Sequence, residues 1–205
     1  MNRFLIAAGV LCLFGSLLAA PAPEYTPEIL FPSLRSGNCE IYIMKPDGKD
    51  AKKLTDGKAK NTFPAWSPDA KKIAFTSDRE GYQAIFVMDA DGKNVKQLTA
   101  EKVTDRAPAW SPDGKKIAYA GTTDTGAEIF FMDADGGDPK ALTKLGGFNS
   151  YAAWSHDGKK IIFQHHDAYD KPGPVYIMDA DGDDQKQILE TEGYIEGGRA
   201  AWKPK

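Results

Sequence analysis

Hydrophobic and polar residues follow one pattern that recurs along most of the chain. One full unit begins with Pro-Ala-Trp-Ser-Pro-Asp at 64–69, continues through apolar runs at 73–75 and 85–88, and ends with Lys-Gln-Leu-Thr at 96–99. The apolar runs are short and rich in β-branched and aromatic residues, which favours strands. Proline in the Ser-Pro-Asp motifs and glycine in the Asp-Gly pairs predict tight turns between them. Each unit therefore predicts four short antiparallel strands.

The unit repeats with a period of about 44 residues. The tryptophans stand at 66, 110, 154 and 202, so their spacings are 44, 44 and 48, and each follows an alanine. A methionine series at 44, 88, 132 and 178 has nearly the same period. Four strands in a repeat of this length are typical of one β-propeller blade. We therefore expect an all-β, four-bladed β-propeller, with tryptophan and alanine filling the gaps between blades.

The two ends of the chain complement each other. Residues 29–44 align without gaps with 73–88, so that Phe31 matches Phe75 and Arg35 matches Arg79. The N-terminus thus supplies strands two, three and four of a blade, and the C-terminal Ala-Ala-Trp at 200–202 supplies an inner strand. This predicts a single domain over 25–205 whose ring is closed by a split blade. We expect a monomer; the alternative is a dimer in which each C-terminal strand completes the partner's blade.

The N-terminal segment has the pattern of an export signal. Asn2 and Arg3 precede an apolar run that ends in small residues at Ala20, which predicts a signal peptide over about 1–20. The alternative is a membrane anchor, but about 17 apolar residues lie at the bottom of the spanning range. We therefore expect cleavage and no stable membrane span in the mature protein. Only Cys39 would then remain, which excludes an intrachain disulfide.

Charge argues against one class of partner. The net charge is −3 and no run of lysine or arginine stands out. Proteins that bind nucleic acid usually carry a basic patch or stripe. Nucleic acid is therefore not an expected partner.

Two motifs carry a family resemblance. Ala-Trp-Ser-Pro-Asp-Gly-Lys-Lys-Ile-Ala at 109–118 and Arg-Ser-Gly-Asn-Cys-Glu-Ile-Tyr-Ile-Met at 35–44 resemble the repeats of TolB-type propellers. The resemblance implies the propeller fold and a periplasmic or extracellular setting in bacteria. It does not imply the role of the TolB protein. That protein resembles a six-bladed propeller with an additional N-terminal α/β domain. Function inferred from fold alone is analogy.

Candidate metal and catalytic motifs are weak. The Asp-Ala-Asp-Gly motifs at 89–92, 133–136 and 179–182 invite a calcium interpretation. Calcium usually takes six to eight oxygen ligands, so we predict hairpin turns capped by aspartate instead. His165 and His166 are adjacent on an extended chain and point opposite ways, so we predict no metal site there. No nucleophile elbow or phosphate-binding loop appears, and we expect no catalytic residues, no cofactor and no enzyme activity.

Positions that differ between repeats are the candidate binding residues. Three positions before each tryptophan stand Phe63, Ala107, Tyr151 and Arg199. We place them in loops between the outer strand and the next inner strand. These loops share a face with the loops between strands two and three, one of which carries His165 and His166 just after strand two. The predicted ligand-binding residues are Phe63, Arg106, Tyr151, His165, His166 and Arg199.

This pattern predicts a secreted or periplasmic, non-catalytic scaffold that binds another envelope or secreted protein through its loop-rich face. The first alternative is a propeller that binds a small molecule or glycan through aromatic side chains. A lyase or hydrolase is less favoured, because the sequence shows no catalytic constellation.

Overall fold

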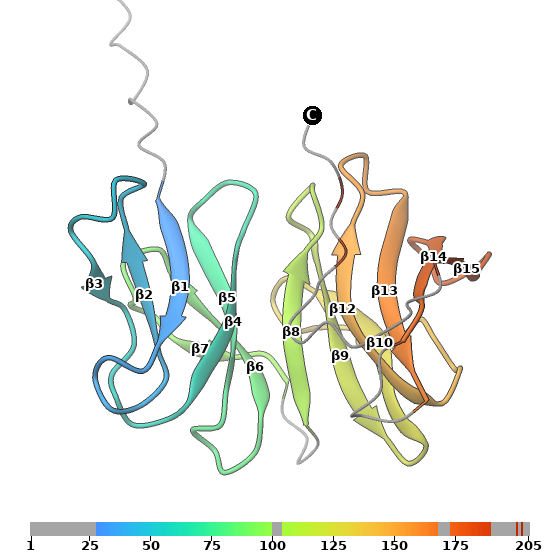
Figure 1. The fold of residues 1–205 in the computed structure, drawn as a ribbon, viewed down its shortest axis with the longest axis horizontal. Coiled ribbons are helices and arrows are strands. Elements are labelled where there is room, and N and C mark those ends of the chain that lie inside the picture. Colours follow the sequence, from blue (N-terminus) through green and yellow to red (C-terminus); the bar gives the residue numbers. More distant parts are fainter. Residues whose placement is uncertain (1–27, 100–103, 168–172, 190–199, 201, 203–205) are drawn as a thin grey trace, which may run out of the picture.

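The computed structural model describes residues 28–99, 104–167 and 173–189, together with 200 and 202. Within these residues the protein contains fifteen strands and no helix (Figure 1). No helix in this part of the chain is long and apolar enough to span a membrane. The predicted signal peptide at 1–20 lies outside the described residues.

The strands fall into four consecutive antiparallel units, which follow one another from blue to red in Figure 1. The first unit contains β1 (Ile29–Ser33), β2 (Glu40–Met44) and β3 (Lys52–Lys53). The second contains β4 (Asn61–Trp66), β5 (Lys72–Ser77), β6 (Ala84–Asp89) and β7 (Lys96–Gln97). The three strands of the first unit are those that the alignment of the chain ends predicts.

The third and fourth units repeat the same order. The third contains β8 (Asp105–Trp110), β9 (Lys116–Thr123), β10 (Gly126–Asp133) and β11 (Lys140–Ala141). The fourth contains β12 (Gly147–Trp154), β13 (Lys160–His166), β14 (Val175–Asp179) and β15 (Lys186–Leu189).

A close approach of two backbones joins the third and fourth units. β10 pairs in parallel with β12 where Gly126 lies opposite Gly147. A Cβ atom on Gly126 would lie 1.7 Å from the Gly147 carbonyl oxygen, so only glycine permits the contact. The two units therefore share one eight-stranded sheet, and no sheet in the described residues closes on itself.

The hydrophobic core lies between the units. Ala74 and Ile85 of the second unit pack with Ile117 and Met132 of the third, and Trp110 covers this cluster. A corresponding cluster under Trp154 joins the third and fourth units. This confirms that the repeated tryptophan packs in the gap between neighbouring units. Burial of these apolar side chains fixes each unit against the next.

The chain end makes a contact that repeats an earlier one. The Trp154 indole nitrogen donates to the Ala109 carbonyl oxygen at 3.2 Å. The Trp202 indole nitrogen donates to the Ala153 carbonyl oxygen at 3.1 Å. Trp202 therefore has the same relation to the fourth unit as Trp154 has to the third. Residues 201 and 203–205 lie outside the described residues, so the split blade and the closed four-bladed ring remain predictions.

The Asp-Gly hairpins are held by their aspartates, in line with the turn interpretation. The aspartate before each glycine accepts a hydrogen bond from the backbone nitrogen two residues later, at 3.0–3.1 Å, in Asp47, Asp91, Asp135 and Asp181. The first aspartate pairs with the lysine of the preceding strand. These pairs are Asp89–Lys72, Asp133–Lys116 and Asp179–Lys160. The Asp-Ala-Asp-Gly carboxylates thus stabilise the hairpins directly.

The two Ser-Pro-Asp turns and the equivalent Ser-His-Asp turn at 155–157 predict an acid-sensitive contribution to stability. Asp69, Asp113 and Asp157 each accept a hydrogen bond from the serine hydroxyl two residues earlier, at 2.6–2.7 Å. These bonds hold the pKa of each carboxyl below its ordinary value of 3.8. Because the folded-state pKa is depressed, the stabilisation is present above 3.8 and is lost as the pH falls through the folded value.

We therefore expect the melting temperature to fall as the pH drops below 3.8. The triple variant Asp69→Asn, Asp113→Asn and Asp157→Asn keeps acceptor oxygens but cannot titrate. Its melting temperature should fall less over the same acid range. Thermal melts of both proteins across pH check this, and parallel curves would contradict the assignment.

Candidate functional site

Three predicted binding residues lie within inner strands rather than loops. Phe63 is in β4, Arg106 in β8 and Tyr151 in β12. The prediction that these positions form connecting loops was therefore wrong. Each strand carries a β-bulge at this point, since the register shifts between Thr62 and Ala65 and at the equivalent places in β8 and β12. The bulge interrupts strand alternation, and the sequence has no glycine there to reveal it.

The bulges place non-glycine residues in the left-handed region. Phe63, Ala107 and Tyr151 have φ values of 52°, 55° and 56°. A residue other than glycine adopts this backbone conformation at a cost of roughly 1–3 kcal/mol. Such strain often occurs at functional sites. Here the strained geometry recurs in three units.

The repeated bulge brings two aromatic rings together. The rings of Phe63 and Tyr151 lie 6.2 Å apart at an interplanar angle of 58°. Their strands, β4 and β12, each contact β8, which lies between them in chain order. The second and fourth units therefore meet through these rings across the end of the molecule where the inner strands begin. We call this end, with Phe63, Arg106 and Tyr151, the axial face.

The structure describes Arg106 but not Arg199, the two arginines among the predicted binding residues. Arg106 lies in β8, immediately before the bulge residue Ala107, and is half-buried. Arg199 lies outside the described residues, and its proposed binding role stays a prediction.

The two histidines lie within β13, not in the loop after it as predicted. Register pairs His165 with Asn149 and His166 with Phe148, so both histidines lie at the axial end. His165 Nδ1 donates to Asn149 Oδ1 at 2.9 Å, and its Nε2 lies 3.5 Å from an Asp167 carboxylate oxygen. The His165 side chain is only 14% exposed, so it can support the axial face more readily than it can contact a ligand.

Buried acid–amide pairs lie beneath the axial face. Glu128 is 4% exposed and accepts hydrogen bonds from Asn149 Nδ2 at 2.8 Å and from Thr143 Oγ1 at 2.5 Å. In the first unit, Glu40 accepts hydrogen bonds from Asn61 Nδ2 and Thr55 Oγ1. A buried carboxylate is stable only when such donors surround it. These side chains therefore stabilise the fold.

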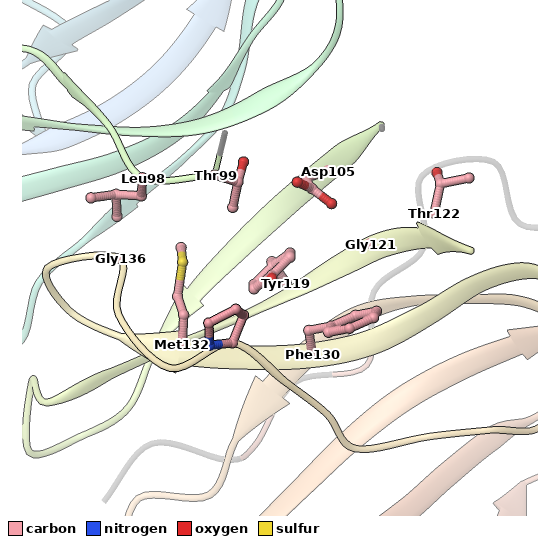
Figure 2. Close-up of a pocket in the computed structure, with 10 residues that line it drawn as sticks. Leu98, Thr99, Asp105, Tyr119, Gly121, Thr122, Phe130, Met132 and Gly136 are labelled. Atoms are coloured by element: carbon pink, nitrogen blue, oxygen red, sulfur yellow. The ribbon is translucent and has the colours of Figure 1, made fainter. Parts of the chain in front are cut away.

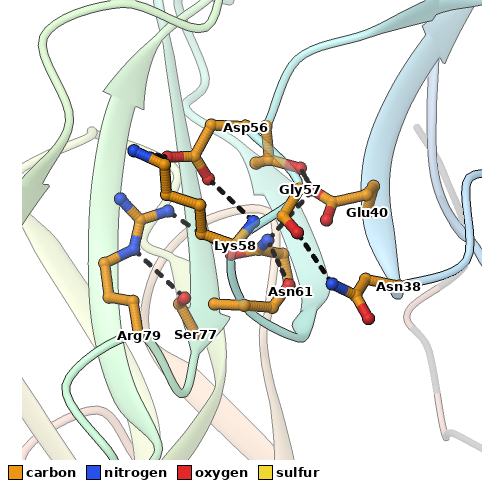
Figure 3. A network of polar contacts seen from close by, with 10 residues as sticks. Asn38, Glu40, Asp56, Gly57, Lys58, Asn61, Ser77 and Arg79 are labelled. Carbon is orange, nitrogen blue, oxygen red and sulfur yellow. Dashed lines mark hydrogen bonds and ion pairs between the residues drawn. The ribbon is translucent and has the colours of Figure 1, made fainter.

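Arginine covers a stacked aromatic pair in the first two units. In the second unit, Phe75 and Phe86 stack across β5 and β6, and the Arg79 guanidinium lies 5.8 Å and 4.8 Å from the two ring centres. Arg79 Nε donates to Ser77 Oγ at 3.2 Å, and its Nη2 donates to Asn61 Oδ1 at 3.5 Å (Figure 3). In the first unit Arg35 lies 5.0 Å and 4.8 Å from the corresponding ring centres. The sequence aligned the two arginines, but the stacking appears only in three dimensions.

Two observations bear on whether the described residues offer a reactive thiol or a metal site. Burial raises the pKa of the half-buried Cys39 thiol, which disfavours the reactive thiolate. In the described parts of the chain, no group of three or more His, Cys, Asp or Glu residues is arranged to hold a metal ion.

Solved structures share the fold. A putative TolB from Agrobacterium tumefaciens is 23% identical with a TM-score of 0.73, over 78% of this chain and 60% of that chain. TolB from Acinetobacter baumannii is 26% identical with a TM-score of 0.69, over 80% of this chain and 41% of that chain. An oligogalacturonate lyase in complex with manganese is 14% identical with a TM-score of 0.63, over 81% of this chain and 50% of that chain.

The matches are limited in extent and in sequence. This chain spans about 60% and 41% of the two TolB chains. The similarity to the lyase, at 14% identity, concerns the fold alone. No curated protein matches the sequence.

A family model that matches most of the sequence identifies the family of this chain. The family model described as the TolB beta propeller domain matches residues 16–202, which is most of the chain. The match agrees with the all-β units, their inter-unit cores and the repeated Ala-Trp and Asp-Gly motifs. The chain belongs to the TolB β-propeller domain family.

Proposed function

We propose that this protein is a non-catalytic binding scaffold that docks another envelope or secreted protein through the axial face. The observation that carries the proposal is the bulge repeated in β4, β8 and β12, which gathers different side chains on one strained, rigid frame. Arginine and tyrosine are enriched at binding hot spots. The axial face presents one of each, with Phe63 beside Tyr151.

The proposed scaffold is an exported monomer with four blades. The signal-like segment at 1–20 and the TolB family membership favour a periplasmic or extracellular location. The contact of Trp202 with Ala153 favours a ring in which the C-terminal segment completes the first unit. A ring closed in this way leaves few strand edges exposed to aggregation.

The second candidate function is binding of a glycan or small molecule. The observation that favours it is the pair of aromatic rings at the axial face, because sugars and flat ligands pack on such rings. A protein partner and a glycan or small molecule differ widely in chemistry, so a binding experiment can distinguish between them.

Site-specific photo-crosslinking in the native host tests the proposal. Lys60 and Lys144 are exposed and lie just before β4 and β12, at the axial end. A photoreactive residue at either position should yield a discrete protein adduct, whereas the same residue at Asp91 or Asp135 in the hairpins should not. Adducts from the hairpins alone would contradict the chosen face. Retention on a glycan array without any protein adduct would favour the second candidate.

A further inference from the structure

A cavity of about 560 Å³ lies between the third and fourth units, at the end of the molecule opposite the axial face. Its described walls consist of the turn residues 111–113 and 156–158 and the hairpin residues 180–181, together with Lys116, Phe131 and Trp154. None of these residues adjoins an undescribed segment in the sequence. Sites for small molecules usually have volumes of about 300–1,000 Å³, so this cavity can hold a ligand. We call it the turn cavity.

The turn cavity differs from the cavity shown in Figure 2, which lies between the second and third units. That cavity has a volume of about 330 Å³, and Tyr119, Phe130 and Met132 are among its lining residues. None of its described lining residues stands at a repeat position equivalent to one that lines the turn cavity. The two cavities therefore arise from different parts of the repeat.

Two departures from the repeat meet at the turn cavity. Phe131 is the only aromatic residue at its repeat position, where the other units carry Ile43, Val87 and Ile177. His156 stands where the two preceding turns carry Pro68 and Pro112. Both Phe131 and His156 line the turn cavity. The fold tolerates the same residues at these positions in other units, so two changes at one cavity favour a function specific to it.

The aromatic walls of the turn cavity are fixed by the fold. The Trp154 indole nitrogen donates to the Ala109 carbonyl oxygen at 3.2 Å. The Lys116 ammonium lies 4.0 Å from the centre of the Phe131 ring and pairs with Asp133 at 3.3 Å. Both rings are half-buried, so each also keeps an exposed surface. A ligand that packs on fixed rings avoids the entropic cost of ordering them.

The polar groups of the turn cavity carry opposite charges. Asp113, Asp157 and Asp181 are exposed and supply carboxylates, which only accept hydrogen bonds. Lys116 supplies an ammonium, which only donates them. The three carboxylates disfavour an anionic ligand, and the ammonium over Phe131 disfavours a cationic one. A hydroxyl group both donates and accepts, so it matches both kinds of wall.

We propose that the turn cavity binds an uncharged oligosaccharide. The C–H face of a sugar ring would pack on Trp154 and Phe131, and its hydroxyl groups would donate to the aspartates and accept from Lys116. Such a ligand combines an apolar face with many neutral donors and acceptors, which is the combination that the walls present. The cavity lies at the opposite end from the axial face, so the inference does not depend on the proposed function.

NMR titration of the mature protein with sugar trimers tests the inference. The neutral probes are cellotriose, maltotriose and triacetylchitotriose. The charged probes are trigalacturonate and deacetylated chitotriose, which are anionic and cationic. We expect at least one neutral trimer to shift the Trp154 indole N–H resonance saturably, at a Kd on the order of 1 mM. The resonance of Trp110, the equivalent residue between the second and third units, should stay unchanged. Both charged trimers should bind at least about tenfold more weakly than the best neutral one.

Variants that copy other units provide the controls. The double variant Phe131→Val and His156→Pro reproduces the residues found between the second and third units, so it should fold. It should bind the best neutral trimer at least about tenfold more weakly. His156→Pro alone changes only an exposed position and should weaken binding severalfold, which keeps the test valid if the double variant is unstable. Ile43→Val changes the repeat position of Phe131 in the first unit and should leave binding unchanged.

The inference is overturned if no neutral trimer gives a saturable shift, if a charged trimer binds as tightly, or if the folded double variant binds like the wild type. Sugar binding that is lost in the variant Phe63→Ala and Tyr151→Ala but survives in the double variant would assign the sugar to the axial face and also overturn it. The protein adducts expected from Lys60 and Lys144 should be the same in the double variant. The two proposals therefore fail separately.

Discussion

Replacement of Trp202 by alanine is expected to lower the free energy of unfolding by about 3 kcal/mol. Truncation of a buried Phe or Trp costs about 3–5 kcal/mol, and the half-buried Trp202 should lie at the lower end. Its indole nitrogen also loses the bond to the Ala153 carbonyl oxygen. Urea denaturation of the mature protein measures the change. The large effect is expected because Trp202 packs against the fourth unit as Trp154 packs against the third.

Matched variants make the Trp202 test specific. Trp154→Ala removes the equivalent contact and should cost a similar amount, whereas truncation after Trp202 should change stability by less than about 0.5 kcal/mol. A Trp202→Ala variant as stable as the wild type would contradict the split-blade closure. A monomer mass in solution would exclude the exchanged dimer, in which the same contact would come from a second copy.

Replacement of Glu128 by alanine is also expected to cost about 3 kcal/mol or more. The buried carboxylate accepts from Asn149 Nδ2, Thr143 Oγ1 and the backbone nitrogen of Gly146. Its removal deprives the buried Thr143 hydroxyl of its acceptor and leaves Asn149 Nδ2 only the Ala127 and Gly146 carbonyl oxygens, at about 1–3 kcal/mol for each group that stays unsatisfied. Chemical denaturation measures the loss.

The second unit provides the compensating change. Ala84 stands at the position of Glu128, and Asp105 stands at the position of Asn149. One buried acid is therefore kept between the second and third units, but it comes from β8 of the third unit. The double variant Glu128→Ala and Asn149→Asp copies this arrangement and should recover at least half of the loss. A double variant no more stable than the single one would show that the two arrangements are not equivalent.

Strands and turns could be predicted because the repeat makes their signals redundant. The 44-residue period places Met88 and Met132 in equivalent strands and aligns the Asp-Gly hairpins, so each expectation is supported in several units. Local signals suffice here, since tight turns and alternating apolar residues depend on near neighbours. The three strands of the first unit follow from the same alignment.

The geometry at the beginning of the inner strands β4, β8 and β12 could not be predicted in the same way. Phe63, Ala107 and Tyr151 adopt left-handed geometry without glycine, because packing at the axial face overrides the local preference. Long-range pairs are equally hidden in the sequence. Asn149 meets Glu128 from a different strand, and Arg79 meets Asn61 eighteen positions away.

Binding of the crosslinked partner by an axial-face variant tests the central claim most directly. The variant Phe63→Ala, Arg106→Ala and Tyr151→Ala should keep its fold, because Ala107 already occupies the same left-handed position in β8. Its control, Asp47→Asn, Asp91→Asn and Asp135→Asn, changes the hairpins but keeps their acceptor oxygens. Isothermal titration with the purified partner should show at least about tenfold weaker binding by the axial variant, about 1.4 kcal/mol, and unchanged binding by the control. Unchanged binding by the axial variant together with weaker binding by the control would contradict the account.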